Sequence, residues 1–164
     1  MSDIMRVNLL PEKVIVHHGG PDPKGIYDGS WPHCAAYYKR FHTEISGKED
    51  IGFHYVVENG SGGTKIGQVT RGREEDMEGG HAKGMNTKSI GVCFAGSFDK
   101  EAPSKKQLEA GAELIADIVV RHGLGVEDIV PHSDFTTGKT CPGDKFPMDK
   151  LKGTVEKKLK KMKR

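Results

Sequence analysis

Long apolar runs are absent from this sequence, and so are the usual marks of export. No stretch of the 164 residues approaches the ~20 apolar positions that a membrane-spanning helix needs. Residues 1–6 contain no basic segment leading into an apolar core, so they do not resemble a secretory signal peptide. We therefore expect a protein without membrane insertion that is cytoplasmic as synthesised.

Cysteine is scarce, with only three residues in the chain. An odd number of cysteines in a cytosolic chain argues against a disulfide framework. Cys34 falls in a helical pattern and Cys93 in a strand pattern, which favours small buried side chains for both. Cys141 differs, because it lies in a polar loop just before Pro142.

The composition is that of an ordinary globular protein, 35% hydrophobic and 29% charged. The length suffices for one buried core. The sequence shows neither an internal repeat nor an interdomain linker. We therefore expect one domain over 1–164, with its core at about 13–151, and a monomer.

The formal net charge of +2 is unevenly distributed. The segment 151–164 carries seven basic residues against one acid, so the rest of the chain is net negative. This basic segment could favour an anionic surface such as a cell wall or nucleic acid. The simpler interpretation, which we prefer, is a C-terminal helix over 147–164 with a solvated basic face and an apolar stripe against the body. We expect no nucleic-acid partner.

Hydrophobic patterning predicts an α/β fold, with a central mixed sheet flanked by helices. Ser30 is expected to cap a helix that carries His42, and Ser104 with Gln107 forms a capping-box pattern ahead of a second helix. Gly123 ends that second helix. The predicted strands are 13–17, a hairpin of 54–58 with 65–69, a central strand over 89–95, and 128–130.

Two histidines each follow a short apolar strand, and a cysteine follows the second one. His17 and His132 could meet where strands end, and Cys141 would add a thiolate. Two imidazoles and one thiolate would make a zinc site with one open position, in which the pKa of water falls towards ~7. Lys139 could place a cation beside a developing oxyanion. The alternative is that these are unrelated loop and core residues, since no short metal motif is present.

The remaining histidines have less distinctive positions. His33 and His42 fit the surface of a helix, and His122 fits a helix-end cation. His18 alternates away from His17, so we expect it to line a groove or to support the site from behind.

Four blocks of the sequence together resemble the zinc-dependent N-acetylmuramoyl-L-alanine amidases of the type 2 family, which includes phage lysozyme-type endolysins and the animal peptidoglycan recognition proteins. The phage branch is the most similar. The blocks are Val14-Ile15-Val16-His17-His18; Gly52-Phe53-His54-Tyr55-Val56-Val57 with Gly67-Gln68-Val69-Thr70-Arg71-Gly72-Arg73; Gly80-His81-Ala82-Lys83-Gly84-Met85-Asn86 with Ser89-Ile90-Gly91-Val92; and His132 through Cys141-Pro142-Gly143.

The resemblance implies an amidase and peptidoglycan-recognition-protein-like fold, with one zinc ion per chain on His17, His132 and Cys141. It implies hydrolysis of the amide that joins N-acetylmuramic acid to L-alanine in bacterial peptidoglycan, on a cell wall reached after release. Lys139 matches the catalytic lysine of the phage-type enzymes. Contact with substrate is expected from a set of groove residues, although His81 could instead support the site from behind. The set is His18, Phe53, His54, His81, Lys83 and Asn86.

Two positions depart from the family pattern. The phage-type and recognition-protein enzymes commonly carry a tyrosine where this chain has Phe53, which lacks a hydroxyl. Another branch carries a glutamate where this chain has Cys93. Lys139 with the metal could suffice, or another group such as Tyr27 could take the role. Loss of a proton-transfer group typically costs ~10²–10⁴-fold in rate.

Two other functions are consistent with the same residues. One is a module that binds wall peptides without cutting them, which Phe53 favours and which Cys141 and Lys139 oppose. The other is a zinc hydrolase acting on a different amide.

Overall fold

The computed structural model describes residues 5–7, 10–21 and 32–162. The regular elements within these residues are five strands, three α-helices and three short helical turns. They are β1 (Lys13–His18), α1 (Ala35–Arg40), a π-helical turn (Phe41–Ile45), β2 (Tyr55–Asn59), β3 (Ile66–Arg71), β4 (Ser89–Phe94), α2 (Lys105–Arg121), a 3₁₀ turn (Val126–Asp128), β5 (Ile129–Pro131), a second 3₁₀ turn (His132–Phe135) and α3 (Met148–Met162).

The five strands form one mixed sheet in the order β3-β2-β4-β1-β5. β1 runs parallel to both β4 and β5, and β2 runs parallel to β4. β3 is antiparallel to β2, which confirms the predicted hairpin. β4 is central and all six of its residues are buried, as expected for its uninterrupted apolar sequence.

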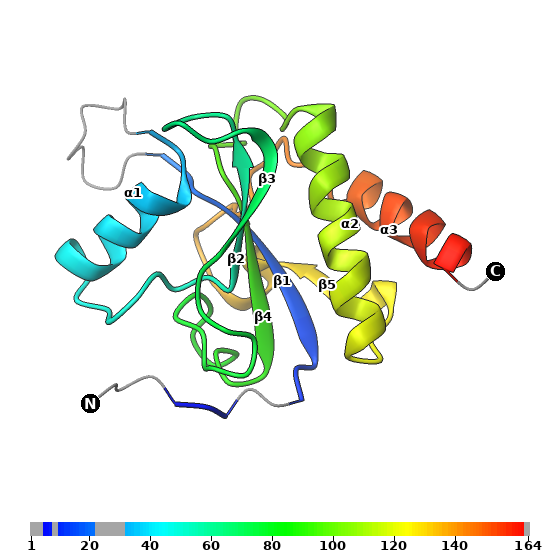
Figure 1. The fold of residues 1–164 in the computed structure, drawn as a ribbon, viewed down its shortest axis with the longest axis horizontal. Coiled ribbons are helices and arrows are strands. Elements are labelled where there is room, and N and C mark those ends of the chain that lie inside the picture. Colours follow the sequence, from blue (N-terminus) through cyan, green and yellow to red (C-terminus); the bar gives the residue numbers. More distant parts are fainter. Residues whose placement is uncertain (1–4, 8–9, 22–31, 163–164) are drawn as a thin grey trace.

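The two faces of the sheet are covered by different helices (Figure 1). Val14, Val92 and Phe94 point towards α2 and α3 and belong to the larger core cluster. Val56 and Cys93 point to the opposite face, where they pack with Ala35 and Tyr38 around α1. Because side chains alternate along a strand, His17 lies on the α1 face and His18 on the other.

The helix α2 begins as predicted at Ser104, whose hydroxyl accepts a hydrogen bond from the Gln107 backbone N–H at 3.1 Å. The reciprocal half of the predicted capping box is wrong. The buried Gln107 amide instead donates to the carbonyls of Val57 (2.9 Å) and Ala95 (2.8 Å). It thereby ties α2 to the middle of β2 and to the residue that follows β4.

The helix α1 starts later than the sequence predicts, at Ala35 with Cys34 as its N-cap. The predicted cap Ser30 lies outside the described residues. Tyr38 anchors this helix: its hydroxyl accepts the Gly96 N–H at 3.1 Å and rests against Gly19, where a Cβ would lie 1.8 Å from the phenol oxygen. This packing fixes α1 over the ends of β1 and β4, beside the candidate site.

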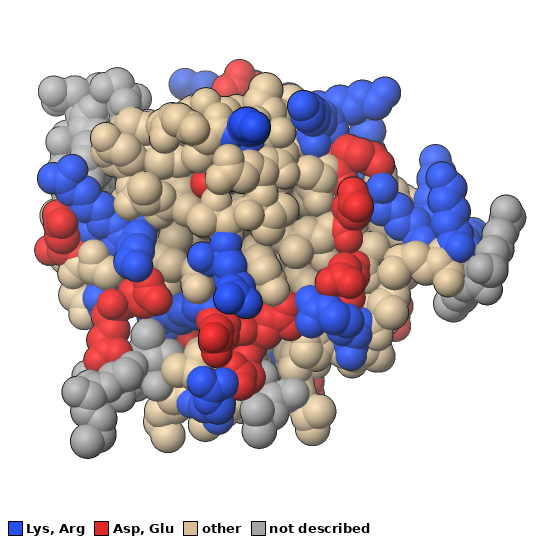
Figure 2. All heavy atoms as spheres, in the orientation of Figure 1, with Lys and Arg blue, Asp and Glu red and all other residues tan. Residues whose placement is uncertain are grey.

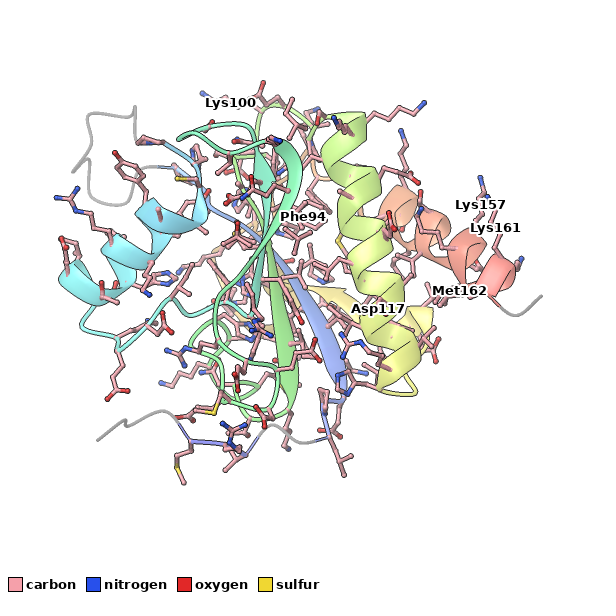
Figure 3. The ribbon with its side chains drawn as sticks, viewed as in Figure 1. Phe94, Lys100, Asp117, Lys157, Lys161 and Met162 are labelled. Atoms are coloured by element: carbon pink, nitrogen blue, oxygen red, sulfur yellow. The ribbon has the colours of Figure 1, made fainter. Side chains whose placement is uncertain are left out.

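The C-terminal helix was predicted over 147–164 and is observed as α3, Met148–Met162; residues 163–164 are not described. Its buried Leu151 and Val155 pack into the larger core, which supports the docked-helix interpretation. Lys157 and Lys161 point away from the body (Figure 3), and basic side chains gather at this edge of the molecule (Figure 2). None of the helices described is long and apolar enough to cross a bilayer.

Candidate functional site

The fold brings together three side chains that are far apart in the sequence. β1 and β5 are parallel neighbours, so His17 near the end of β1 and His132 just after β5 lie at the same edge of the sheet. Their ring centroids are 4.4 Å apart. The loop after His132 is closed by a 2.9 Å hydrogen bond from the Ser133 N–H to the Cys141 carbonyl. As a result, one ligand atom from each of His17, His132 and Cys141 lies within 4.8 Å of the others.

Hydrogen bonds to the backbone and to a neighbouring histidine hold two members of this cluster in place. Cys141 Sγ lies 3.8 Å from His17 Nδ1 and accepts the His18 backbone N–H at 3.4 Å. The other nitrogen of His17, Nε2, lies 2.8 Å from His81 Nδ1. His17 therefore has Nδ1 available for a metal while its far edge is held by the protein.

A chain of hydrogen bonds continues behind His17. His81 Nε2 lies 3.4 Å from Ser89 Oγ, and the Ser89 hydroxyl donates to the Met85 carbonyl at 2.7 Å. If His17 binds a metal through Nδ1, its Nε2–H must donate to His81, whose own Nε2–H then faces Ser89. Every bond in this chain has a consistent direction, because the final carbonyl can only accept.

Glycines make the room that His81 occupies. A Cβ on Gly79 would lie 2.4 Å from the His81 ring, and one on Gly91, in the middle of β4, would lie 2.7 Å from it. The ring therefore lies directly on the sheet beneath the site. Its position matches the support-from-behind alternative considered for His81 in the sequence analysis.

The ionisation of the cluster is set by burial. Burial, followed by repulsion from His81 and His132, holds the pKa of His17 well below its usual value. Burial and then Lys139 lower the pKa of His132. Burial raises the pKa of the Cys141 thiol to about 11, against the opposing effects of the His18 N–H and Lys139. Both imidazoles are thus neutral, as metal ligands must be, and a dication would supply the charge that a thiolate needs.

The cluster opens into a hollow of about 500 Å³, lined on one side by Phe53 and His42 and on the other by Lys139. Phe53 is nearly buried and packs against both histidines, with ring-centroid distances of 5.0 Å to His17 and 5.3 Å to His42. A tyrosine in place of Phe53 would direct its hydroxyl into this part of the hollow. Tyr27, considered as its replacement, lies outside the described residues.

His42 is a site residue that the sequence analysis missed by assigning it to a helix surface. Its Nδ1 accepts the Gly52 N–H at 2.8 Å, which leaves the proton on Nε2. Burial, then Lys48 and Arg73, lower its pKa to about 4, so the ring is neutral near pH 7. The periodicity that places His42 on one face with Ala35 and Tyr38 was the signal available in the sequence, because that face packs against the sheet.

The expected substrate contacts divide into open and enclosed residues. His18 lines the hollow with one edge, while its Nδ1 accepts the Phe98 N–H at 3.0 Å. His54 is 0% exposed, and both of its nitrogens are hydrogen-bonded, Nδ1 to the Gly91 N–H (3.0 Å) and Nε2 to the Met77 carbonyl (2.9 Å). This geometry gives His54 a structural role and leaves it no free edge for the substrate contact expected of it.

A second hollow of about 340 Å³ adjoins the first, and both share Gly80, His81, His132 and Lys139 as lining residues. Lys83 and Asn86 line the second hollow, as the groove-loop resemblance implied. The Asn86 side-chain oxygen accepts the N–H groups of both His81 and Ala82 at 2.9 Å, so it shapes the loop that carries Lys83.

Comparison with known proteins identifies the family of this chain. The sequence profile of the N-acetylmuramoyl-L-alanine amidase family matches residues 8–144. The chain belongs to this family. Among curated relatives, peptidoglycan-recognition protein SD of Drosophila simulans is 40% identical to this chain over 114 residues. These residues are 67% of this chain and 55% of that protein. The chain is 29% identical to the endolysin of Klebsiella phage KP32 over 109 residues, 63% of this chain and 66% of that protein.

Solved structures show that this family member has the amidase and peptidoglycan-recognition-protein fold. It superposes on the N-acetylmuramoyl-L-alanine amidase LysC from Clostridium intestinale URNW with a TM-score of 0.77 at 22% identity, covering 94% of this chain and 91% of that one. A mutant of Drosophila PGRP-LB in complex with tracheal cytotoxin gives a TM-score of 0.69 at 25% identity, covering 88% and 82%. The aligned region spans about half to two thirds of the length of the first curated relatives.

Proposed function

We propose that this chain is a zinc-dependent amidase that hydrolyses the bond between N-acetylmuramic acid and L-alanine in bacterial peptidoglycan. The observation that carries the proposal is the convergence of His17, His132 and Cys141 on one groove edge beside Lys139, in a chain of the amidase family. The proposal places its action on the cell wall.

The residues present fit a zinc ion. Two neutral imidazoles and one sulfur are a donor set typical of catalytic zinc, and they leave one position open to the hollow. When bound, zinc would supply Lewis-acid polarisation of the scissile carbonyl and activation of water. His17 and His132 would hold the ion through nitrogen, and Cys141 through sulfur.

The groove residues would position the substrate and stabilise the charge that develops on it. Lys139 is exposed at the border of both hollows, near enough to His132 and Cys141 to influence their pKa values. Its ammonium group would stabilise the carbonyl oxygen as that atom becomes negative. His42 would present its Nε2–H to the same hollow, where it could donate to a substrate oxygen in place of the hydroxyl that Phe53 lacks.

The direct test is digestion of purified sacculi. An amidase releases new L-alanine amino groups without new reducing sugar ends. The appearance of reducing ends alone would indicate a glycosidase and would refute the proposal. Screening unrelated acyl-amides alongside muropeptides would reveal a zinc hydrolase of different specificity.

A Lys139→Ala variant separates catalysis from binding. It should retain zinc and wall binding while its turnover falls by about 10²-fold or more, as for the loss of one oxyanion-stabilising donor. Lys150→Ala, which removes an exposed lysine of α3 that lines neither hollow, is the matched control and should keep full turnover. A wild-type protein that binds sacculi but releases no amino groups would support the non-catalytic binding module.

A further inference from the structure

The second hollow contains three lysines and no acidic residue. Lys48, Lys83 and Lys139 line it from three separate segments, together with Gly80, Asn86 and Thr136. By contrast, the hollow over the candidate metal site includes the carboxylate of Asp99. The protein therefore places three positive charges around a single small cavity next to the proposed reaction centre.

Within the part of the chain that the structure describes, no ion pair joins Lys48, Lys83 or Lys139 to a carboxylate. Other lysines are paired, such as Lys13 with Asp128 at 2.9 Å and Lys158 with Glu109 at 2.7 Å. Ammonium groups that face one cavity repel each other, so an anion bound among them would relieve an unfavourable arrangement.

The backbone around the hollow fixes where two of the lysines start. Lys48 is half-buried, and its side chain lies against Gly80, where an added Cβ would be 3.2 Å from the Lys48 Cε atom. Lys83 lies within the turn that Asn86 closes with two hydrogen bonds. Both side chains thus begin from ordered positions on the cavity wall.

We propose that this hollow is a subsite for a carboxylate of the substrate peptide, and that Lys48 and Lys83 select acidic stem peptides over amidated ones. The ligand class follows from the properties of the cavity. The cavity is small, is lined by cationic side chains and is continuous with the proposed metal site through His81 and His132. An ammonium is a compact point charge that suits a carboxylate. This inference rests on the proposed function, because it takes a muramoyl peptide as the substrate.

The test compares N-acetylmuramoyl-L-alanyl-D-glutamate with the same compound in which both glutamate carboxylates are primary amides. The wild type should prefer the acid by about three- to tenfold in kcat/KM, mainly through KM, as expected for partly exposed charge-assisted contacts. Lys48→Gln and Lys83→Gln should each bring this ratio towards one. Lys88→Gln, an exposed lysine on the loop of Lys83 that does not line the hollow, should leave the ratio unchanged.

Calorimetric binding measurements with both compounds distinguish failure of the subsite proposal from failure of the proposed hydrolytic function. If neither compound is cleaved but the acid binds more tightly than the amide and Lys83→Gln abolishes the difference, the subsite stands and the hydrolytic function does not. If both are cleaved equally well, or if neither binds, the subsite is refuted. A preference for the acid that survives in both lysine variants also refutes it.

Discussion

His17 Nε2 lies 2.8 Å from His81 Nδ1, and this contact determines which nitrogen of His17 faces the candidate metal site. The partner of a metal-binding histidine is usually a carboxylate or a carbonyl. Here it is a second imidazole, which is buried and in turn meets Ser89. His17 is therefore held by an uncharged side chain. The strength of this hydrogen bond depends on which nitrogen of His81 carries the proton.

His81→Ala should weaken zinc binding by about 10–100-fold, because His17 loses the group that orients its ring. The measurement is competition with a chromophoric zinc chelator, so it does not depend on turnover. His122→Ala removes a histidine at the far end of α2 and should leave zinc affinity unchanged. Equal zinc affinity in His81→Ala and wild type would show that the contact has no positioning role.

Cys141→Ser should abolish stoichiometric zinc binding. A serine hydroxyl has a much higher pKa than a thiol and does not replace a thiolate as a zinc ligand at neutral pH. Metal analysis of the purified protein should find about one zinc per chain in the wild type. Cys34→Ser alters a cysteine outside the cluster and should retain the metal, so zinc loss in both variants would contradict the assignment.

Phe53→Tyr should increase turnover by about 10²-fold, the lower end of the usual range for a proton-transfer group, because a phenol would add to the hydrogen bond proposed for His42. The ring already packs against His17 and His42, so a hydroxyl would enter the hollow between these groups. Steady-state kinetics on muropeptides is the measurement, with zinc content as the control for site integrity. An unchanged kcat in a variant that keeps its zinc would contradict this prediction.

The acid stability of the fold should depend on Glu75, away from the groove. Burial raises the pKa of Glu75, but hydrogen bonds from Arg121, Tyr55 and His122 outweigh it and hold the value at about 2. Since the folded-state pKa is depressed, its contribution is complete above pH 4.5 and is lost as the pH falls towards about 2.

Glu75→Gln should lower the free energy of unfolding at pH 6 by about 2 kcal/mol, allowing for the solvent that reaches the network. It should also flatten the loss of stability between pH 4.5 and pH 2. Urea unfolding at several pH values measures both effects. Glu113→Gln, on the same helix as Arg121, is a control, and an identical pH profile in Glu75→Gln and wild type would contradict the prediction.

Local pattern was enough to predict most of the secondary structure. The β-branched run before His17, the alternation in the hairpin and the apolar stripe of α2 each correspond to one face of a buried element. The predictions that depended on remote partners were less accurate. Gln107 was expected to bond within its own helix turn, but its buried amide donates instead to the carbonyls of Val57 in β2 and of Ala95 just after β4.

The candidate site likewise combines features that local sequence pattern predicts with features that depend on remote partners. In the sequence, two histidines after strands and a cysteine in a polar loop already indicated a nitrogen–sulfur donor set. Tertiary contacts, which local sequence pattern does not encode, bring His17, His132 and Cys141 together, place His42 in the hollow and enclose His54. The reason is that these outcomes depend on parallel pairing between strands more than a hundred residues apart, on glycines that leave room for His81, and on burial from both sides of the sheet.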